Sequence, residues 1–275
     1  VYKRQYLVGA LYASWRGAAP DVRLVAGLLL ALAVAAAVHL ANEAADHATD
    51  RLAQRTPFSG GSGALAASGL DPRVPLVASL LIALSVTVAL AAALAAAVLP
   101  ATAVLLLGLG LAGGLAYSLP PVAAMRRGWG EPLNALLGGL ALPLLGVATV
   151  AGALEAVDIV AFLPLLFVVF ASVLATAWPD RDADAATGKA TMQVRLPRAR
   201  LRLFHALATT GFLVCTAVVV TTDALPSAWA LLLVVPPLLI GSLTYTRRRS
   251  PLPNVVAMVG LTAILLVTLA LEVAR

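Results

Sequence analysis

Two short segments of the sequence gather acidic side chains at helical spacing. In the first, Asn42, Asp46 and Asp50 recur at every fourth residue. In the second, Asp180 and Asp184 are also four residues apart. Residues with this spacing lie along one face of a helix, where neighbouring carboxylates repel each other. Each segment therefore predicts a stack of oxygen-bearing side chains that needs a cation.

The side-chain types in these segments indicate which cation. Hard divalent ions prefer carboxylate and amide oxygens, and Mg²⁺ typically combines one or two carboxylates with substrate phosphates. If the two segments face each other, they would hold Mg²⁺ around a diphosphate and favour cleavage of its C–O bond. A solvated helix end that binds nothing and an ion relay in a transporter are the alternative interpretations.

The composition excludes a soluble protein. Of the 275 residues, 61% are hydrophobic and only 12% are charged, whereas about 25% are charged in a typical soluble domain. Disorder is excluded as well, because the apolar content is too high. A single cysteine, Cys215, excludes a disulfide framework and a cysteine-based zinc site. We therefore expect an all-α polytopic membrane protein.

Eight apolar runs are each long enough to cross a bilayer, which takes about 20 residues. Backbone groups in lipid must be hydrogen-bonded internally, so the runs must be helices. They are residues 22–41, 74–99, 101–118, 133–152, 159–178, 203–222, 227–245 and 254–273. Residues 1–15 are interpreted as the end of a further helix whose start is missing. The sequence thus predicts a single domain over residues 1–275, a bundle of nine transmembrane helices around a central cavity.

The basic residues predict the topology. The loops after the second, fourth, sixth and eighth predicted helices hold 14 of the 19 Lys and Arg residues. The positive-inside rule assigns these loops to the cytoplasm. Both acidic segments belong to this face, at helix ends rather than in mid-membrane, which disfavours the transporter. Membrane lipids account for the net charge of +6, and no nucleic-acid partner is needed.

With these segments in this order, the sequence resembles the UbiA superfamily of intramembrane prenyltransferases. The family's first motif, Asn-Asp-x-x-Asp-x-x-x-Asp, stands here as residues 42–50, with Glu43 in place of the usual Asp. The second, Asp-x-x-x-Asp, stands as residues 180–184. Residues 117–121, residues 126–131 and Asn134 are also similar to the family.

The resemblance implies Mg²⁺-dependent transfer of a prenyl group from a prenyl diphosphate, and it assigns roles. The metal ligands would be Asn42, Asp46, Asp50, Asp180 and Asp184. The four aspartates would also be catalytic, together with Tyr117, whose ring face would shield an allylic cation. The diphosphate would contact Arg55, Arg126 and Lys189. Further candidates are Glu43, Asp182, Ser59 and Asn134.

The segment from Tyr117 to Asn134 departs from the family pattern at one position. Several family members carry a Tyr-x-x-x-Lys element, but here Pro121 stands four residues after Tyr117. Arg126 or Arg127 would supply the missing positive charge. Asn134 is expected to begin its helix, where it would contact the acceptor or cap the helix N-terminus.

The segment from Arg55 to Gly63 indicates the acceptor. It resembles the branch that prenylates dihydroxynaphthoate in menaquinone synthesis, so the expected substrates are a polyprenyl diphosphate and an aromatic quinone precursor. The alternatives are 4-hydroxybenzoate, a glycerol-phosphate lipid, a haem or a chlorin. A CDP-alcohol phosphotransferase is disfavoured, because the sequence lacks an Asp-Gly-x-x-Ala-Arg element.

Overall fold

The computed structural model describes residues 2–54, 57–58, 61 and 63–275, and these form only helices and connecting loops. This confirms the all-α prediction for the described part of the chain. The elements are α1 (Tyr2–Trp15), α2 (Val22–Asp50), α3 (Ala64–Ser68), α4 (Arg73–Ala95), α5 (Ala101–Ser118), η1 (Ala124–Arg126), α6 (Gly130–Leu136), η2 (Leu137–Ala141), α7 (Leu142–Ala151), α8 (Ala156–Ala177), α9 (Arg181–Ala186), α10 (Met192–Arg195), α11 (Arg198–Thr221), η3 (Ala228–Val234), α12 (Val235–Thr244) and α13 (Leu252–Val273).

All eight predicted apolar runs fall on helices, but the expected count of nine transmembrane helices is not confirmed. Within the described residues, seven helices are long and apolar enough to cross a membrane: α2, α4, α5, the continuous stretch α6–η2–α7, α8, α11 and α13. The run at 228–244 is shorter and begins as a 3₁₀ helix. Helix α1 has only 14 residues, fewer than the roughly 20 that a bilayer requires.

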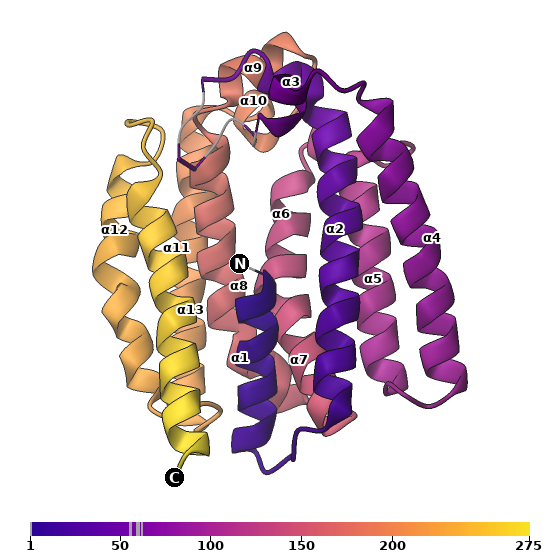
Figure 1. Cartoon of the computed structure of the whole chain (residues 1–275). Helices are drawn as coiled ribbons and strands as arrows, with labels where there is room; N and C mark the ends of the chain where they lie inside the picture. The colour runs from indigo at the N-terminus through magenta and orange to yellow at the C-terminus, as the bar shows by residue number, and fades with distance from the viewer. Residues whose placement is uncertain (1, 55–56, 59–60, 62) are drawn as a thin grey trace.

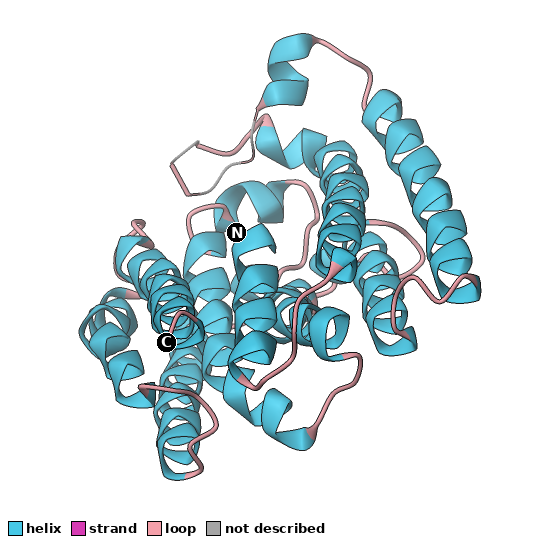
Figure 2. Cartoon of the chain, turned by 60° about the horizontal axis from the view of Figure 1, so that its bottom comes forward, coloured by secondary structure: helices cyan, strands magenta, loops and turns pink. Residues whose placement is uncertain are grey.

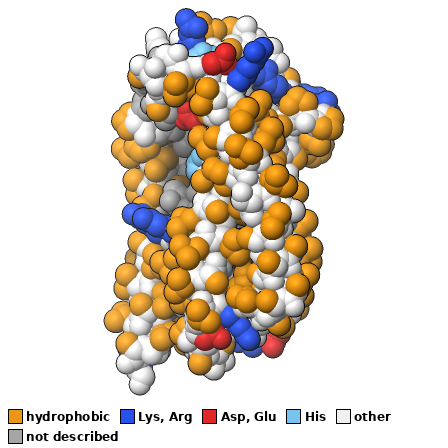
Figure 3. All heavy atoms as spheres, turned by 45° about the vertical axis from the view of Figure 1, so that its right-hand side comes forward, with side chains coloured by type: hydrophobic (Ala, Val, Ile, Leu, Met, Phe, Trp, Pro, Cys, Tyr) orange, Lys and Arg blue, Asp and Glu red, His pale blue; other side chains and the backbone are white. Residues whose placement is uncertain are grey.

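The long helices lie side by side, and the short helices α3, α9 and α10 gather at one end, the top of Figure 1. Figure 2, which brings the opposite end forward, shows the same helices with loops joining them at both ends. On the face in Figure 3, hydrophobic side chains cover the middle of the helices. Large apolar side chains such as Leu81, Leu84 and Leu105 point outward. An apolar outer belt of this kind is what lipid contact requires.

Helices α1 and α7 pack with their backbones in contact. A Cβ atom at Gly9 would overlap the carbonyl oxygen of Pro143, and one at Gly146 would overlap the carbonyl oxygen of Tyr6. Small residues allow such an approach between membrane helices, whose association depends on close packing rather than on a hydrophobic driving force. The fully buried rings of Tyr12 and Phe162 continue this core toward α8.

The stretch α6–η2–α7 is not a regular helix. A π-helical segment, Leu137–Ala141, interrupts it, and a Cβ atom at Gly139 would lie only 2.6 Å from the Cα atom of Leu166 on α8. Single π turns inside α-helices occur frequently at functional sites, because they redirect the side chains that follow. Here the segment presents Leu137 and Gly138 to a cavity between the helices.

This packing predicts the effect of one methyl group. Gly146→Ala should lower the free energy of unfolding by about 1–3 kcal/mol, because the new Cβ atom must push α1 away from α7. Gly108→Ala is the matched control, since a Cβ atom at Gly108 on α5 meets nothing within 4 Å. Unfolding of the purified protein in detergent measures both. Equal stability of the two variants would contradict the backbone contact.

Candidate active site

The two acidic segments, far apart in the sequence, meet at one end of the bundle. The first forms the last turns of α2, and the second lies at the start of α9. The ammonium group of Lys189 joins them: its Nζ atom lies 2.7 Å from Oδ1 of Asp46 and 3.5 Å from Oδ1 of Asp184. The hydroxyl groups of Thr49 and Thr187 are 2.9 Å apart and form a second link.

A cavity of about 240 Å³ lies between these segments. Its described lining holds one cationic side chain, that of Lys189, and six carboxylates: Glu43, Asp46, Asp50, Glu131, Asp180 and Asp184. The amide of Asn42 and the hydroxyl groups of Thr49 and Thr191 also line it. This acidic cavity therefore carries a large surplus of negative charge.

Burial changes the pKa values of two residues in the acidic cavity. The residues Asp184 and Lys189 are 3% and 8% exposed. Burial raises the pKa of the Asp184 carboxyl, although the charge of Lys189 and a hydrogen bond from Thr191 partly oppose this. Burial alone would lower the pKa of Lys189, but the carboxylates of Asp46 and Asp184 outweigh it, so the pKa is raised. Lys189 therefore stays charged, and its charge only partly offsets the effect of burial on the Asp184 carboxylate.

The loop after α2 approaches the same cavity. Phe58 and Gly61 line it, and a Cβ atom at Gly61 would overlap the carboxylate of Asp50. The backbone of Gly61 has φ of +67°, which glycine adopts without steric cost. Two predicted site residues of this loop, Arg55 and Ser59, lie outside the described residues.

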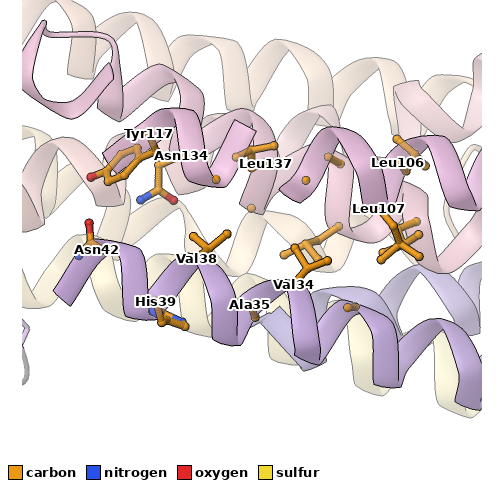
Figure 4. A pocket seen from close by; sticks show the side chains of 17 residues that line it. Val34, Ala35, Val38, His39, Asn42, Leu106, Leu107, Tyr117, Asn134 and Leu137 are labelled. Carbon is orange, nitrogen blue, oxygen red and sulfur yellow. The ribbon is translucent and has the colours of Figure 1, made fainter. Parts of the chain in front are cut away.

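A second, apolar cavity of about 200 Å³ adjoins the acidic one. It lies between α2, α5 and the stretch α6–η2–α7, and Asn42, Tyr117 and Asn134 line both cavities. Figure 4 shows these three residues at one end of the apolar cavity and Leu106 and Leu107 at the other. The hydroxyl group of Ser118 donates to Oδ1 of Asn42 over 3.2 Å and fixes that amide at the junction.

The structure places two predicted residues away from the acidic cavity. Asp182 is exposed and points to the other side of α9, where its carboxylate lies 3.4 Å from Nη2 of Arg249. Arg126 donates from Nη2 to the carbonyl oxygen of Ala45 over 3.0 Å, so it ties η1 to α2. Neither residue lines the acidic cavity.

The expected helix-capping role of Asn134 is wrong. Helix α6 begins at Gly130, so Asn134 lies in its second turn rather than at its N-terminus. The apolar pattern placed the start too late, because the polar residues Glu131 and Asn134 belong to the helix. The side chain of Asn134 is left to line the junction of the two cavities.

Glu131 adds a carboxylate to the acidic cavity that was not among the predicted site residues. This side chain is 5% exposed, and its Oε1 atom accepts a hydrogen bond from the backbone N–H of Met192 over 3.0 Å. Its Oε2 atom has no hydrogen-bond partner among the described residues. The available signal was a lone carboxylate in a helix, Gly130–Ala151, that is otherwise free of charge.

The donor atoms of the acidic cavity fit a hard cation. Carboxylate and amide oxygens dominate the described lining, which holds no histidine or cysteine. In the described part of the chain, no three His, Cys, Asp or Glu side chains already form a metal-binding group. The ammonium group of Lys189 instead stands between Asp46 and Asp184. Oxygen ligands with surplus negative charge are those that Mg²⁺ prefers.

Two solved structures resemble this fold. One is a UbiA homolog from Archaeoglobus fulgidus bound to DMAPP and Mg²⁺, with a TM-score of 0.67 and 17% sequence identity, covering 99% of this chain and 96% of that one. The other is a UbiA homolog from the same organism bound to GPP and Mg²⁺, with a TM-score of 0.64 and the same identity and coverage. At this identity the likeness shows the fold.

Sequence comparison identifies the family. A search among curated proteins gave no match. The model of the UbiA prenyltransferase family, in contrast, matches residues 5–261. Because that match covers nearly the whole chain, the protein belongs to the UbiA prenyltransferase family and is a transferase.

Proposed function

We propose that this protein transfers a polyprenyl group from a prenyl diphosphate to an aromatic acceptor. One observation carries the proposal: the acidic and apolar cavities adjoin, and Asn42, Tyr117 and Asn134 line both. The diphosphate head would lie in the acidic cavity and the prenyl tail in the apolar one, where each buried CH₂ contributes about 0.8 kcal/mol. The prenyl diphosphates bound by the two archaeal homologs support this donor class.

The same proposal includes Mg²⁺ as the cofactor. Its ligands would be Asn42, Asp46, Asp50, Asp180 and Asp184, with Glu43 beside them. When bound, Mg²⁺ supplies the positive charge that stabilises a leaving diphosphate. Lys189 would donate charge-assisted hydrogen bonds to the same oxygens, and the predicted contact from Arg55 stays part of the proposal. Arg126 would act through the backbone of α2 rather than by touching the diphosphate.

Residues at the junction of the two cavities would control the chemistry. The ring of Tyr117 lines both cavities, so it would border the C–O bond of the donor, and its face would stabilise an allylic cation. The apolar lining beyond it would keep water from capturing that cation. The acceptor ring would then attack the cationic carbon, the proton lost from the attacked ring carbon would pass to the departing diphosphate, and Asn134 would orient the acceptor.

The acceptor we favour is dihydroxynaphthoate. The segment from Arg55 to Gly63 supports this acceptor through its resemblance to the menaquinone branch. The planar guanidinium group of an arginine at the mouth of the acidic cavity would pair with the acceptor carboxylate in bidentate geometry. The other acceptors named above, 4-hydroxybenzoate, a glycerol-phosphate lipid, a haem and a chlorin, would use the same two cavities.

We also propose that the protein is a multi-pass membrane protein whose active-site loops face the cytoplasm. The four basic loops meet at the active-site end, where Arg249 of the last loop donates to Gln54 of the first over 3.0 Å. The positive-inside rule then supplies the orientation. The stretch Ala228–Thr244 would add a further crossing, because its 3₁₀ part rises faster and extends the whole to about 29 Å.

The first test of this function removes one proposed metal ligand. Asp184→Asn should lower the turnover of a labelled prenyl diphosphate by roughly 10³-fold or more, because the leaving diphosphate loses charge stabilisation. A chelator should abolish turnover by the unaltered protein, and added Mg²⁺ should restore it.

The matched control is Asp223→Asn, an exposed aspartate in the loop that follows α11 at the other end of the bundle. This variant should keep full activity. Full activity of Asp184→Asn, or undiminished turnover with the chelator present, would refute the proposed metal site.

The second test identifies the acceptor. Dihydroxynaphthoate, 4-hydroxybenzoate and geranylgeranylglycerol phosphate are supplied separately with one prenyl diphosphate, and the product of each reaction is measured. We expect turnover of dihydroxynaphthoate. Turnover of the glycerol lipid alone would overturn the aromatic acceptor, and turnover of 4-hydroxybenzoate alone would assign the protein to the ubiquinone branch.

A further inference from the structure

A third cavity, of about 310 Å³, lies on the opposite side of α9 from the acidic cavity. We call it the arginine pocket, because six arginines from three segments line it: Arg181, Arg198, Arg202, Arg247, Arg248 and Arg249. Asp182 is the one carboxylate in its described lining, and it pairs with Arg249 at 3.4 Å. The pocket therefore carries a surplus of positive charge, opposite in sign to the active site.

Two of these arginines are anchored by hydrogen bonds through Nε. The Nε atom of Arg181 donates to the carbonyl oxygen of Gln193 over 2.9 Å, and that of Arg202 donates to the hydroxyl oxygen of Thr246 over 2.7 Å. Since these bonds use Nε, the Nη atoms can still donate to an anion. A membrane-topology signal needs only positive charge near the helix ends and does not require fixed side chains. The anchored guanidinium groups therefore indicate a binding site.

An aromatic ring holds a third arginine in the pocket. The guanidinium carbons of Arg181 and Arg198 each lie 5.5 Å from the centre of the Trp178 ring. Stacking of this kind reduces the conformational freedom that a guanidinium group loses when it binds a ligand. Planar guanidinium groups match the oxygen geometry of phosphate and bind it in bidentate fashion.

The position of the arginine pocket indicates where a phosphate group would come from. The pocket lies where α11 begins and where α12 joins α13, so it is at the ends of apolar helices. Leu203, Leu243 and Leu252, on these same helices, are 57%, 67% and 48% exposed. A lipid headgroup in the pocket would leave its acyl chains beside such apolar surface.

We propose that the arginine pocket binds a phosphate group, supplied by an anionic phospholipid or by free phosphate. The exposed leucines favour the phospholipid. Helix α9 separates the two cavities, with Asp184 lining the acidic one and Arg181 lining the arginine pocket. A bound phosphate would therefore steady the helix that carries the second acidic motif. The binding itself does not depend on the proposed prenyl transfer.

The experiment measures lipid and phosphate binding by the delipidated full-length chain. Native mass spectrometry in detergent follows titration with phosphatidylglycerol and, separately, with phosphatidylcholine. A third arm adds inorganic phosphate and records the unfolding temperature. Arg198→Gln removes an exposed arginine of the pocket, and Arg200→Gln is the matched control, since Arg200 is exposed on the same helix but does not line the pocket.

We expect phosphatidylglycerol to bind the unaltered chain and Arg200→Gln equally, and Arg198→Gln roughly tenfold or more weakly. Arg247→Gln, at a second exposed pocket residue, should give the same loss. The same pattern with inorganic phosphate and not with phosphatidylglycerol would support the site with free phosphate as its source. Equal binding by all variants in every arm, or a loss as large for Arg200→Gln, would overturn the proposal.

Discussion

Carboxylates crowd together at one end of the bundle, and the surrounding helices and loops must hold them there. Six line the acidic cavity, and Lys189 alone among its described lining offsets them. Two like charges about 4 Å apart repel by about 4 kcal/mol at a partly screened protein site. The chain must therefore hold these side chains together by other means. The same charge surplus would hold a cation and, through it, a diphosphate.

Helix packing in the bundle and ion pairs between the loops and helices together hold these side chains in place. Backbone contact at Gly9 and Gly146 fixes α1 against α7. The stretch that ends in α7 carries the buried carboxylate of Glu131 in its first turn. At the active-site end, Lys189, which follows α9, pairs with Asp46 on α2 and with Asp184 on α9. Helix α9 then separates two cavities of opposite charge. This short helix has Asp184 on one side and Arg181 on the other, so two residues three positions apart line cavities of opposite charge.

The sequence was informative where spacing alone decides the structure. Four-residue spacing placed Asp46 with Asp50 on one face of α2, and loop charge indicated which loops share an end. The sequence was uninformative where a contact between residues far apart in the chain determines the position of a side chain. Nothing local shows that Arg126 reaches the carbonyl of Ala45, or that Glu131 accepts from Met192. Hydropathy also does not distinguish the 3₁₀ start of the run at 228–244 from an α-helix, so the number of crossings was not fixed.

In the proposed reaction, the acidic and apolar cavities would bind the two ends of one substrate. Gly110 tests it, because it lines the apolar cavity about 10 Å along α5 from Tyr117. Gly110→Leu would fill the space needed by a long tail, whereas Gly108→Leu on the same helix, at a residue outside that lining, would not. Rates with dimethylallyl and long polyprenyl diphosphates should show that Gly110→Leu keeps the short donor and loses roughly tenfold or more on the long one. An unchanged dependence of the rate on donor chain length would show that the prenyl tail does not bind in the apolar cavity.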